Sequence, residues 1–318
     1  MYYRIRHLTR FVYSEPVYES LVELRMHPRT EGSQRCLDFK VTVTPKAQIL
    51  TYRDHLGNSV QHFGIPAPHL TLQITTESVV EMMPYPELPD ALPASAWADL
   101  DKAIEDGDYW PKLLPSTYAK PTELLLEFME EFGLDRHGDP LSLVREVNAK
   151  IYKAFEYVPM STRVDSPIDE ALSQRKGVCQ DMTHIMIAVL RQLRIPARYV
   201  SGYVFRRPGD RNRSSEGATH AWVEAFLPSL GWVGFDPTNN LEANERHIRT
   251  ALGRDYADVP PTRGIHKGAA DSKLTVAVGV NACEDLPPEL AEMVTEWDVE
   301  IDRHIGTAED LLNRQEQM

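Results

Sequence analysis

The hydrophobic pattern of this chain has a period of two residues in its first part and of 3.6 residues further on, and this change constrains the fold most. Three early segments alternate apolar with polar side chains: YYRIRHLTRFVYS at 2–14, LDFKVTVTP at 37–45 and HLTLQITTESVVEM at 69–82. Such alternation predicts half-buried strands, and LGNS at 56–59 predicts a hairpin turn. We expect residues 1–84 to form a small antiparallel β domain.

A proline-rich stretch, MMPYPELPDALPAS, follows these strands directly. It contains Pro84, Pro86, Pro89 and Pro93. Proline donates no backbone hydrogen bond, so the stretch predicts an irregular connection rather than a strand or a helix. We assign residues 85–119 to a linker with a short helix, and residues 120–285 to a second domain.

Helix start and stop signals divide the beginning of this second domain. TELLLEFMEEFG is expected to form a helix that ends at Gly133, and Asp139-Pro140 supplies an N-cap and a first-turn proline for the next helix. Ser166-Pro167 repeats the start signal. We interpret Gly177 as the residue that ends this helix, because glycine readily adopts the backbone conformations found after a last helical turn.

The next helical pattern is strongly amphipathic, with apolar residues at i, i+3, i+4, i+7, i+8 and i+11. These residues are Met182, Ile185, Met186, Val189, Leu190 and Leu193. Cys179 lies three residues before Met182 and therefore shares the apolar stripe at the helix N-terminus. Strand patterns follow at 197–205, 220–228 and 231–239, and helices followed by an antiparallel sheet predict an α+β fold.

Composition and charge exclude several classes of protein. The 318 residues include 34 basic and 47 acidic side chains, a formal charge of −13 that repels phosphate backbones and anionic membrane surfaces. We therefore expect no nucleic acid and no membrane as a partner. No stretch matches a cleavable signal or a membrane-spanning helix. Three widely spaced cysteines, Cys36, Cys179 and Cys283, fit a reducing compartment, so we expect a cytoplasmic protein.

The last part of the chain carries weaker signals. KLTVAVGV at 273–280 has the pattern of one further strand. Residues 286–318 are acidic and helical in pattern, and we assign them to a tail that is not needed for chemistry. The oligomeric state cannot be deduced from these patterns.

Cys179 is a candidate nucleophile because a helix N-terminus, with its free N–H groups and its dipole, favours a thiolate. A catalytic thiol also needs an imidazole. His184 lies five residues on, about 140° around the helix from Cys179, and points elsewhere. His220 opens a later strand and Asp236 closes the strand after it. A cysteine on a helix, with a histidine and a carboxylate on neighbouring strands, is the arrangement of a Cys-His-Asp triad.

The hairpin between the last two strands offers a test of this hypothesis. Opposed residues of an antiparallel pair have a constant sum of residue numbers, and a two-residue turn at Ser229-Leu230 gives an odd sum. An odd sum would place His220 and Asp236 on opposite faces of the sheet. The triad therefore requires a loop of odd length or a one-residue bulge in this hairpin.

Four motifs in this order resemble the transglutaminase-like superfamily of papain-like thiol enzymes. They are GVCQD at 177–181, IPARYVSGY at 195–203, THAWVEAF at 219–226 and GWVGFDPT at 231–238. The early strands and MHPR at 26–29 resemble the β domain that precedes this core in a bacterial and archaeal subfamily. The resemblance implies an α+β fold with a papain-like core, in which helices pack on an antiparallel sheet, behind a small antiparallel β domain.

The resemblance also implies a role for each site residue. Cys179 would be the nucleophile, His220 the general base and acid, and Asp236 the residue that orients His220, while the backbone N–H of Cys179 would donate to the oxyanion. The expected activity is thioester-forming acyl transfer on a peptide or protein substrate, ending in hydrolysis, as in a peptidase or amidase, or in transamidation. No metal and no cofactor is implied. Family membership leaves the substrate open.

Other interpretations of the same residues remain. Cys179 alone could be a core hydrophobe, His220 a structural strand histidine and Asp236 a turn residue. A zinc site built from Cys179, His184, His220 and Asp236 matches metal chemistry by ligand type, but no close ligand pair supports it. A non-catalytic binding or scaffold protein on the same fold is the third possibility. Tyr157 is a weaker candidate for a second oxyanion donor, chosen only from its position upstream of Cys179.

Overall fold

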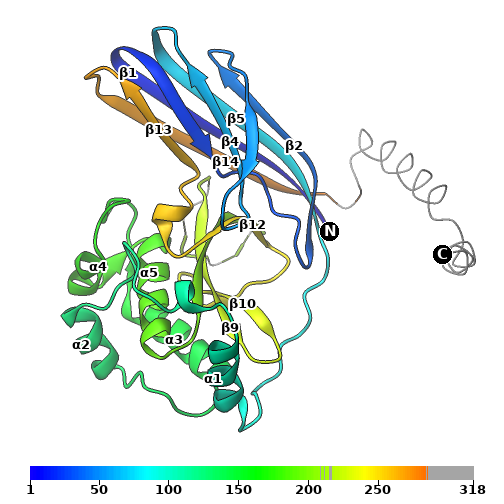
Figure 1. The fold of residues 1–318 in the computed structure, drawn as a ribbon, viewed down its shortest axis with the longest axis vertical. Coiled ribbons are helices and arrows are strands. Elements are labelled where there is room, and N and C mark those ends of the chain that lie inside the picture. The colour runs from blue at the N-terminus through cyan, green and yellow to red at the C-terminus, as the bar shows by residue number, and fades with distance from the viewer. Residues whose placement is uncertain (208, 211, 215–216, 284, 286–318) are drawn as a thin grey trace, which may run out of the picture.

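The computed structural model describes residues 1–207, 209–210, 212–214, 217–283 and 285, and they form two domains (Figure 1). The predicted tail at 286–318 lies outside the described residues. The N-terminal domain contains β1 (Tyr2–Leu24), β2 (Gln34–Thr44), β3 (Leu50–Arg53), β4 (Ser59–Ile65) and β5 (His69–Met82). All four predicted features of this region, the three long strands and the hairpin turn at 56–59, are confirmed.

The sheet of the N-terminal domain is built around the long strand β1, in the order β2-β5-β1-β4-β3. The first half of β1 pairs with β5 and the second half with β4, so the sheet curls around its own buried residues. Two late strands, β13 (Thr262–Lys267) and β14 (Ser272–Cys283), also pair with β1. They lie within the range 120–285 that the sequence analysis gave to the second domain, yet they complete the first.

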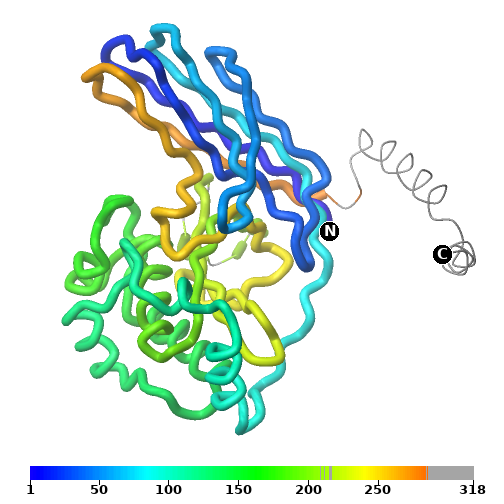
Figure 2. The backbone as a smooth tube through the Cα atoms, in the orientation of Figure 1, coloured from blue at the N-terminus to red at the C-terminus, as the bar shows by residue number. Residues whose placement is uncertain are grey.

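The tube in Figure 2 follows the chain from β5 down into the second domain, and then back at β13. The second domain, called the core domain below, contains five α-helices in its described part: α1 (Ala96–Asp106), α2 (Glu123–Glu131), α3 (Pro140–Ala154), α4 (Ile168–Gln174) and α5 (Cys179–Gln192). Short 3-10 helices lie at η1 (Trp110–Lys112) and η2 (Tyr256–Asp258). Buried residues of α1 belong to the core domain's hydrophobic cluster, so this helix packs with the domain that follows it.

Five strands form the sheet of the core domain, in the order β11-β10-β9-β8-β12. They are β8 (Ala197–Val204), β9 (His220–Leu227), β10 (Gly231–Asp236), β11 (Leu241–Glu242) and β12 (His247–Gly253). Helix α5 packs on β8 and β9, and its apolar stripe is buried as the sequence predicted. The α+β architecture with helices on an antiparallel sheet is therefore confirmed.

The helix boundaries follow the predicted signals with one exception. Gly133 follows the end of α2 with a positive φ of 59°, and the Asp139 carboxylate caps α3 by accepting from the N–H groups of Leu141 and Ser142 at 3.0 and 3.2 Å. The prediction for Gly177 is wrong. Helix α4 ends at Arg175, which adopts the left-handed conformation, and Gly177 lies in the two-residue strand β7 (Lys176–Gly177).

Two polar side chains of the N-terminal domain bind the free edge of β12 and join the domains. The amide of Gln34 accepts from the N–H of Arg249 at 2.7 Å and donates to its carbonyl at 2.9 Å. Asn58 makes the same reciprocal pair with the backbone of Leu252, at 2.8 and 2.9 Å. Each amide takes the place of a strand neighbour, so β12 is capped by the first domain and the two domains pack closely.

Candidate active site

Cys179 is the first residue of α5, where backbone N–H groups are not used by the helix itself. The turn before it is fixed by β7, which pairs in parallel with β6 (Glu156–Tyr157). Gly177 is needed here for space, since a Cβ on it would lie 3.0 Å from the side chain of Asp181. That carboxylate accepts from the N–H of Val178 at 2.8 Å, and the helix start is thereby held in place.

The hairpin that carries the other two candidates has the irregularity that a triad requires. Leu227 pairs with Gly231, so the loop contains three residues rather than two, and the register sum is even throughout the pair. Ser229 in this loop has a φ of 63°. An even sum puts His220 and Asp236 on the same face of the sheet, two positions apart along the ladder. The predicted odd-length loop is confirmed.

His220 and Asp236 form a buried hydrogen-bonded pair. Nε2 of His220 donates to Oδ2 of Asp236 over 2.8 Å, and the two side chains are 5% and 0% exposed. Burial alone would lower the pKa of His220, but the Asp236 carboxylate and the Cys179 side chain outweigh it and raise that pKa to about 10. Burial opposes ionisation of Asp236 as well, yet His220 and His247 hold the pKa of Asp236 well below its usual range.

The second ring nitrogen of His220, Nδ1, remains buried with no hydrogen-bond partner among the described residues. Because the carboxylate occupies Nε2, Nδ1 is the atom left for proton exchange. The interaction between the Cys179 side chain and the imidazole contributes to the raised pKa of His220. The structure thus brings together all three residues that the sequence analysis selected.

The surroundings of Asp236 include two residues that the sequence analysis did not find. Asn239 donates its side-chain N–H to Oδ2 over 2.7 Å, and its backbone N–H and that of Thr238 donate to Oδ1 over 3.2 and 3.0 Å. His247 lies 3.4 Å from Oδ2 through Nε2, while its Nδ1 accepts from the N–H of Asn244. That acceptor role places the His247 proton on Nε2, pointing at the carboxylate. No motif in the sequence marks His247, which approaches from β12.

His184 lies elsewhere, as the helical angle predicted. Its Nε2 accepts from the backbone N–H of Tyr256 at 3.2 Å, and its ring stacks on Tyr118 with centroids 5.4 Å apart. Burial lowers the pKa of His184 to about 3, so the ring is neutral. His184 therefore has the contacts of a structural residue.

Asp181 differs from the solvated carboxylate that its position in the first helical turn indicates. It is buried, and it accepts from the hydroxyl of Thr162 at 2.6 Å as well as from Val178. Burial raises the pKa of Asp181 above its ordinary value. Tyr157 lies in β6 and pairs with Gly177, two residues before Cys179.

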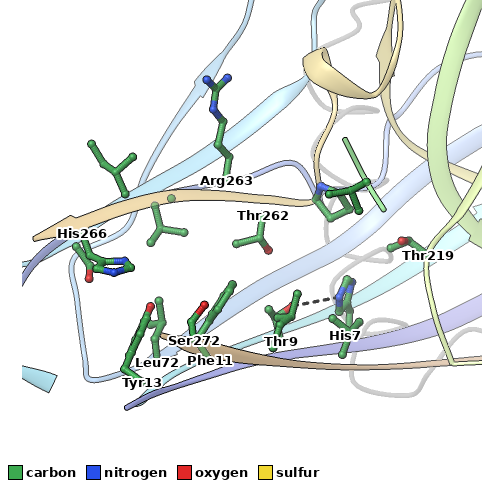
Figure 3. Close-up of a pocket in the computed structure, with 18 of the residues that line it drawn as sticks. His7, Thr9, Phe11, Tyr13, Leu72, Thr219, Thr262, Arg263, His266 and Ser272 are labelled. Atoms are coloured by element: carbon green, nitrogen blue, oxygen red, sulfur yellow. Dashed lines mark hydrogen bonds between the residues drawn. The ribbon is translucent and has the colours of Figure 1, made fainter. Parts of the chain in front are cut away.

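Two cavities are lined by residues of the segment 217–220, which ends at His220. The first, of roughly 500 Å³, extends between the curled sheet and the core domain, and Figure 3 shows its lining from Tyr13 and His266 at one end to His7 and Thr219 at the other. Tyr256 also lines it. Burial raises the pKa of Tyr256, and the nearby Tyr118 and Cys179 raise it further. The second cavity, of roughly 460 Å³, includes His220 itself.

The structure gives no support to a zinc site. In the part of the chain that it describes, no group of three or more histidine, cysteine, aspartate or glutamate side chains is arranged to hold a metal ion. All three cysteines, each within that part, are unpaired thiols. None of the described helices is both long and apolar enough to cross a membrane.

The fold is that of a papain-like core, and comparison with known proteins gives the family. Residues 3–81 match the bacterial transglutaminase-like N-terminal region, and residues 133–237 match the transglutaminase-like superfamily. An uncharacterized protein of Mycobacterium leprae is 32% identical over 278 residues, which span 87% of this chain and 97% of that protein. The chain belongs to the transglutaminase-like superfamily, with the N-terminal region found in its bacterial members.

Two further comparisons frame this assignment. A crystal structure from Cytophaga hutchinsonii, provisionally described as a cysteine protease, shares the fold with a TM-score of 0.67 and 23% identity, over 90% of this chain and 95% of that one. A protein-glutamine gamma-glutamyltransferase of Pseudomonas aeruginosa is 33% identical over 138 residues, which are 39% of this chain and 20% of that protein.

Proposed function

We propose that this protein catalyses acyl transfer from a peptide or carboxamide substrate through a thioester on Cys179. One observation carries the proposal: the buried His220 donates from Nε2 to Asp236, and the side chain of Cys179, at the start of α5, interacts with the same imidazole, whose Nδ1 the carboxylate leaves free. A nucleophile, a base and an orienting carboxylate in this relation are what a thiol acyltransferase requires.

The first half of the reaction follows from this arrangement. In the resting pair the thiol proton already lies on Nδ1 of His220, in line with the raised pKa of this ring, and the sulfur of Cys179 attacks the carbonyl carbon as a thiolate. The backbone N–H of Cys179, free at the start of the helix, donates to the developing oxyanion. His220 then gives its proton to the leaving nitrogen as the C–N bond breaks, which releases ammonia from a carboxamide or an amine from a peptide and leaves the thioester.

The second half depends on which molecule attacks the thioester. Water gives hydrolysis, and a primary amine gives transamidation, with His220 accepting the proton in both cases. The second cavity, which includes His220, provides a separate approach for this acceptor. The Pseudomonas aeruginosa relative, described as a glutamyltransferase, favours including an amine in the assay.

The test combines thiol labelling with a substrate screen. Mild iodoacetamide at neutral pH is expected to alkylate Cys179 selectively. Cys36 is the internal control, because burial, followed by the nearby Asp38, raises the pKa of Cys36 to about 12. Glutamine peptides are then incubated with and without a dansylated primary amine, and released ammonia and dansylated peptide are measured.

The matched variants are Cys179→Ala and Cys36→Ala. Ammonia release and dansyl incorporation should vanish in the first and stay at the wild-type level in the second. Turnover that survives in Cys179→Ala would reject the mechanism. Equal, slow alkylation of Cys36 and Cys179 would remove the evidence for an activated nucleophile and favour a binding protein on this fold.

A further inference from the structure

Strand β14 has a free edge that leads to the candidate active site. It pairs with β1 on one side, from Tyr2–Cys283 to Tyr13–Ser272. On its other side, the N–H of Val278 donates to the carbonyl of Gly217 over 2.9 Å, three residues before His220. The outer edge of β14 therefore meets the chain segment that carries the imidazole.

The register of β14 decides which backbone groups lie on that edge. The N–H of Val278 points away from β1, so His7 and Val278 form a non-hydrogen-bonded pair. Every second pair along an antiparallel ladder is also non-hydrogen-bonded, so the N–H and C=O groups of Val276 and Leu274 point away from β1 as well. In the described part of the chain, no backbone partner takes these outward groups.

The side chains of the same residues are unusually apolar for an exposed edge strand. Leu274 is 54% exposed and Val276 is 40% exposed, and Ile265 on the facing strand β13 is 70% exposed. Long edges with exposed apolar residues are usually blunted by charges, prolines or covering loops, since they attract other strands. Lys273 stands at the start of this edge, but residues 274–280 contain no charge and no proline. An edge of this composition next to the candidate active site indicates a binding surface.

The first cavity gives the chemistry of the expected occupant. Leu274 and Val276 line it, together with the rings of Phe11, Tyr13 and His266. Phe11 stacks on Tyr13 with centroids 6.4 Å apart, and His266 contacts Tyr13 edge-on at 5.1 Å. These rings lie at the end of the cavity farthest from Thr219 (Figure 3). They favour an aromatic or aliphatic side chain several residues away from the reacting group.

Charge in this cavity is low although the chain carries a formal charge of −13. Of the described residues, no aspartate or glutamate lines it. The positively charged Arg263 belongs to the lining, but Figure 3 shows its side chain pointing away from the cavity. Burial lowers the pKa of His7 to about 4, so this ring is neutral. A charged side chain here would lose hydration without gaining an opposite charge.

We propose that the acyl-donor segment is an uncharged, apolar peptide that binds as an added strand on the outer edge of β14. This inference rests on the proposed function, because it places the reacting carbonyl between Cys179 and His220. The bound peptide forms backbone hydrogen bonds with the outward-pointing N–H and C=O groups of Leu274 and Val276, and its side chains enter the cavity. The distance from Ser272 to Val276 corresponds to an extended segment of about four residues, at roughly 3.4 Å each.

Binding is measured with the full chain carrying Cys179→Ala, so that no chemistry is needed. The probes are two fluorescein-labelled hexapeptides of valine, leucine and phenylalanine with one glutamine, placed first or last, and the same peptides with two lysines among the apolar residues. Fluorescence anisotropy should show tight binding for at least one uncharged peptide and at least tenfold weaker binding for its lysine form. Equal affinity for both forms would overturn the proposed specificity.

The edge itself is tested with Val276→Pro and, as the matched control, Val276→Thr. Proline removes an N–H that does not bond to β1, so the pairing inside the sheet is kept. We expect Val276→Pro to weaken peptide binding at least tenfold, and Val276→Thr to change it less than twofold. Equal binding by the two variants would overturn strand addition.

Amide hydrogen exchange of residues 272–277 in the Cys179→Ala protein covers the case in which Val276→Pro disturbs folding. Addition of the peptide should slow exchange there, and unchanged exchange at saturation would overturn the proposal. Light scattering tests the rival occupant, a second copy of this chain: a dimer that Val276→Pro dissociates would also overturn it. Peptide binding at this edge without any turnover by the wild type would reject the proposed function, and with it the role of the peptide as acyl donor, while a failure of binding alone would overturn only this inference.

Discussion

Two buried histidines of the core domain, each close to an aspartate, have opposite charge states. His220 donates directly to Asp236 over 2.8 Å, and its pKa is raised to about 10 although burial opposes this. The pKa of His184 is lowered to about 3, because burial exceeds the attraction of Asp255. The Asp255 carboxylate bonds to the N–H groups of Tyr118 and Ala257 instead of the ring. At His220 the charge of Asp236 and its hydrogen bond together outweigh burial, whereas at His184 the charge of Asp255 does not.

The contrast extends to the hydrogen-bond partners of the two rings. His184 must be neutral to accept from the backbone N–H of Tyr256, so its surroundings select the unprotonated form. His220 donates to a carboxylate that also accepts hydrogen bonds from Asn239 and His247. These bonds keep Asp236 ionised, and the ionised carboxylate favours the protonated form of His220. One site is built to remain neutral and the other to hold and release a proton.

The largest expected effect comes from removing the carboxylate of Asp236, which makes His220 differ from His184. In Asp236→Asn, His220 loses its charged partner and the orientation of its ring, as in serine enzymes that lose the triad aspartate. We expect the rate of Cys179 alkylation at pH 7 and any turnover to fall by about a thousandfold. Iodoacetamide kinetics followed by mass spectrometry measure this, and a loss of less than tenfold would contradict the role of Asp236.

A smaller effect is expected at His247, which donates to the same oxygen of Asp236 as His220 does. His247→Phe removes that donor, and a hydrogen bond to a charged group contributes about 1.5–3 kcal/mol, so the alkylation rate should fall about tenfold or more. His247→Gln keeps a donor and is the matched control. If both variants react at the wild-type rate, His247 does not position the carboxylate.

The alkaline side of the stability profile should report His220. Because the pKa of His220 is higher in the folded protein, its stabilising contribution is complete below the unfolded pKa of 6.5 and is lost as pH rises through about 10. Urea unfolding at pH 6.5, 8 and 9.5 is expected to show this loss in the wild type and a shallower loss in Asp236→Asn. Parallel profiles for the two proteins would show that the pair does not hold the proton.

The acid side should report His184, with little effect on reactivity. Because the pKa of His184 is lower in the folded protein, unfolding takes up a proton between about pH 3 and 6.5, so stability falls as the pH drops through this window. His184→Gln keeps an acceptor for Tyr256 and should flatten this part of the unfolding profile, while Cys179 alkylation changes less than twofold. A tenfold loss of alkylation would place His184 in the site.

The three site residues were predictable because each occupies a position with a local signature. Cys179 follows a turn and starts an apolar helix, His220 is the first residue of one strand, and Asp236 is the last residue of the next. The required parity even predicted the three-residue loop of the hairpin. His247 carries no such signature, because it reaches Asp236 only through the pairing of β12 with β8.

The same distinction separates the correct and incorrect parts of the fold prediction. Hydrophobic period and capping residues depend on near neighbours in the chain, so the strands of the first domain, α3 and α5 were predicted correctly. The end of α4 at Arg175 was missed, because Gly177 is required by its close contact with Asp181 and not by a helix end.

By itself, the sequence determined the period of each element, the helix that starts at Cys179 and the parity that a triad demands, since these follow from chain geometry over a few residues. Only the tertiary structure decided that β13 and β14 return to β1, that Asp181 is buried, and that the edge of β14 leads to His220. Strand pairing joins residues more than two hundred positions apart, and the patterns of single strands do not specify their partners.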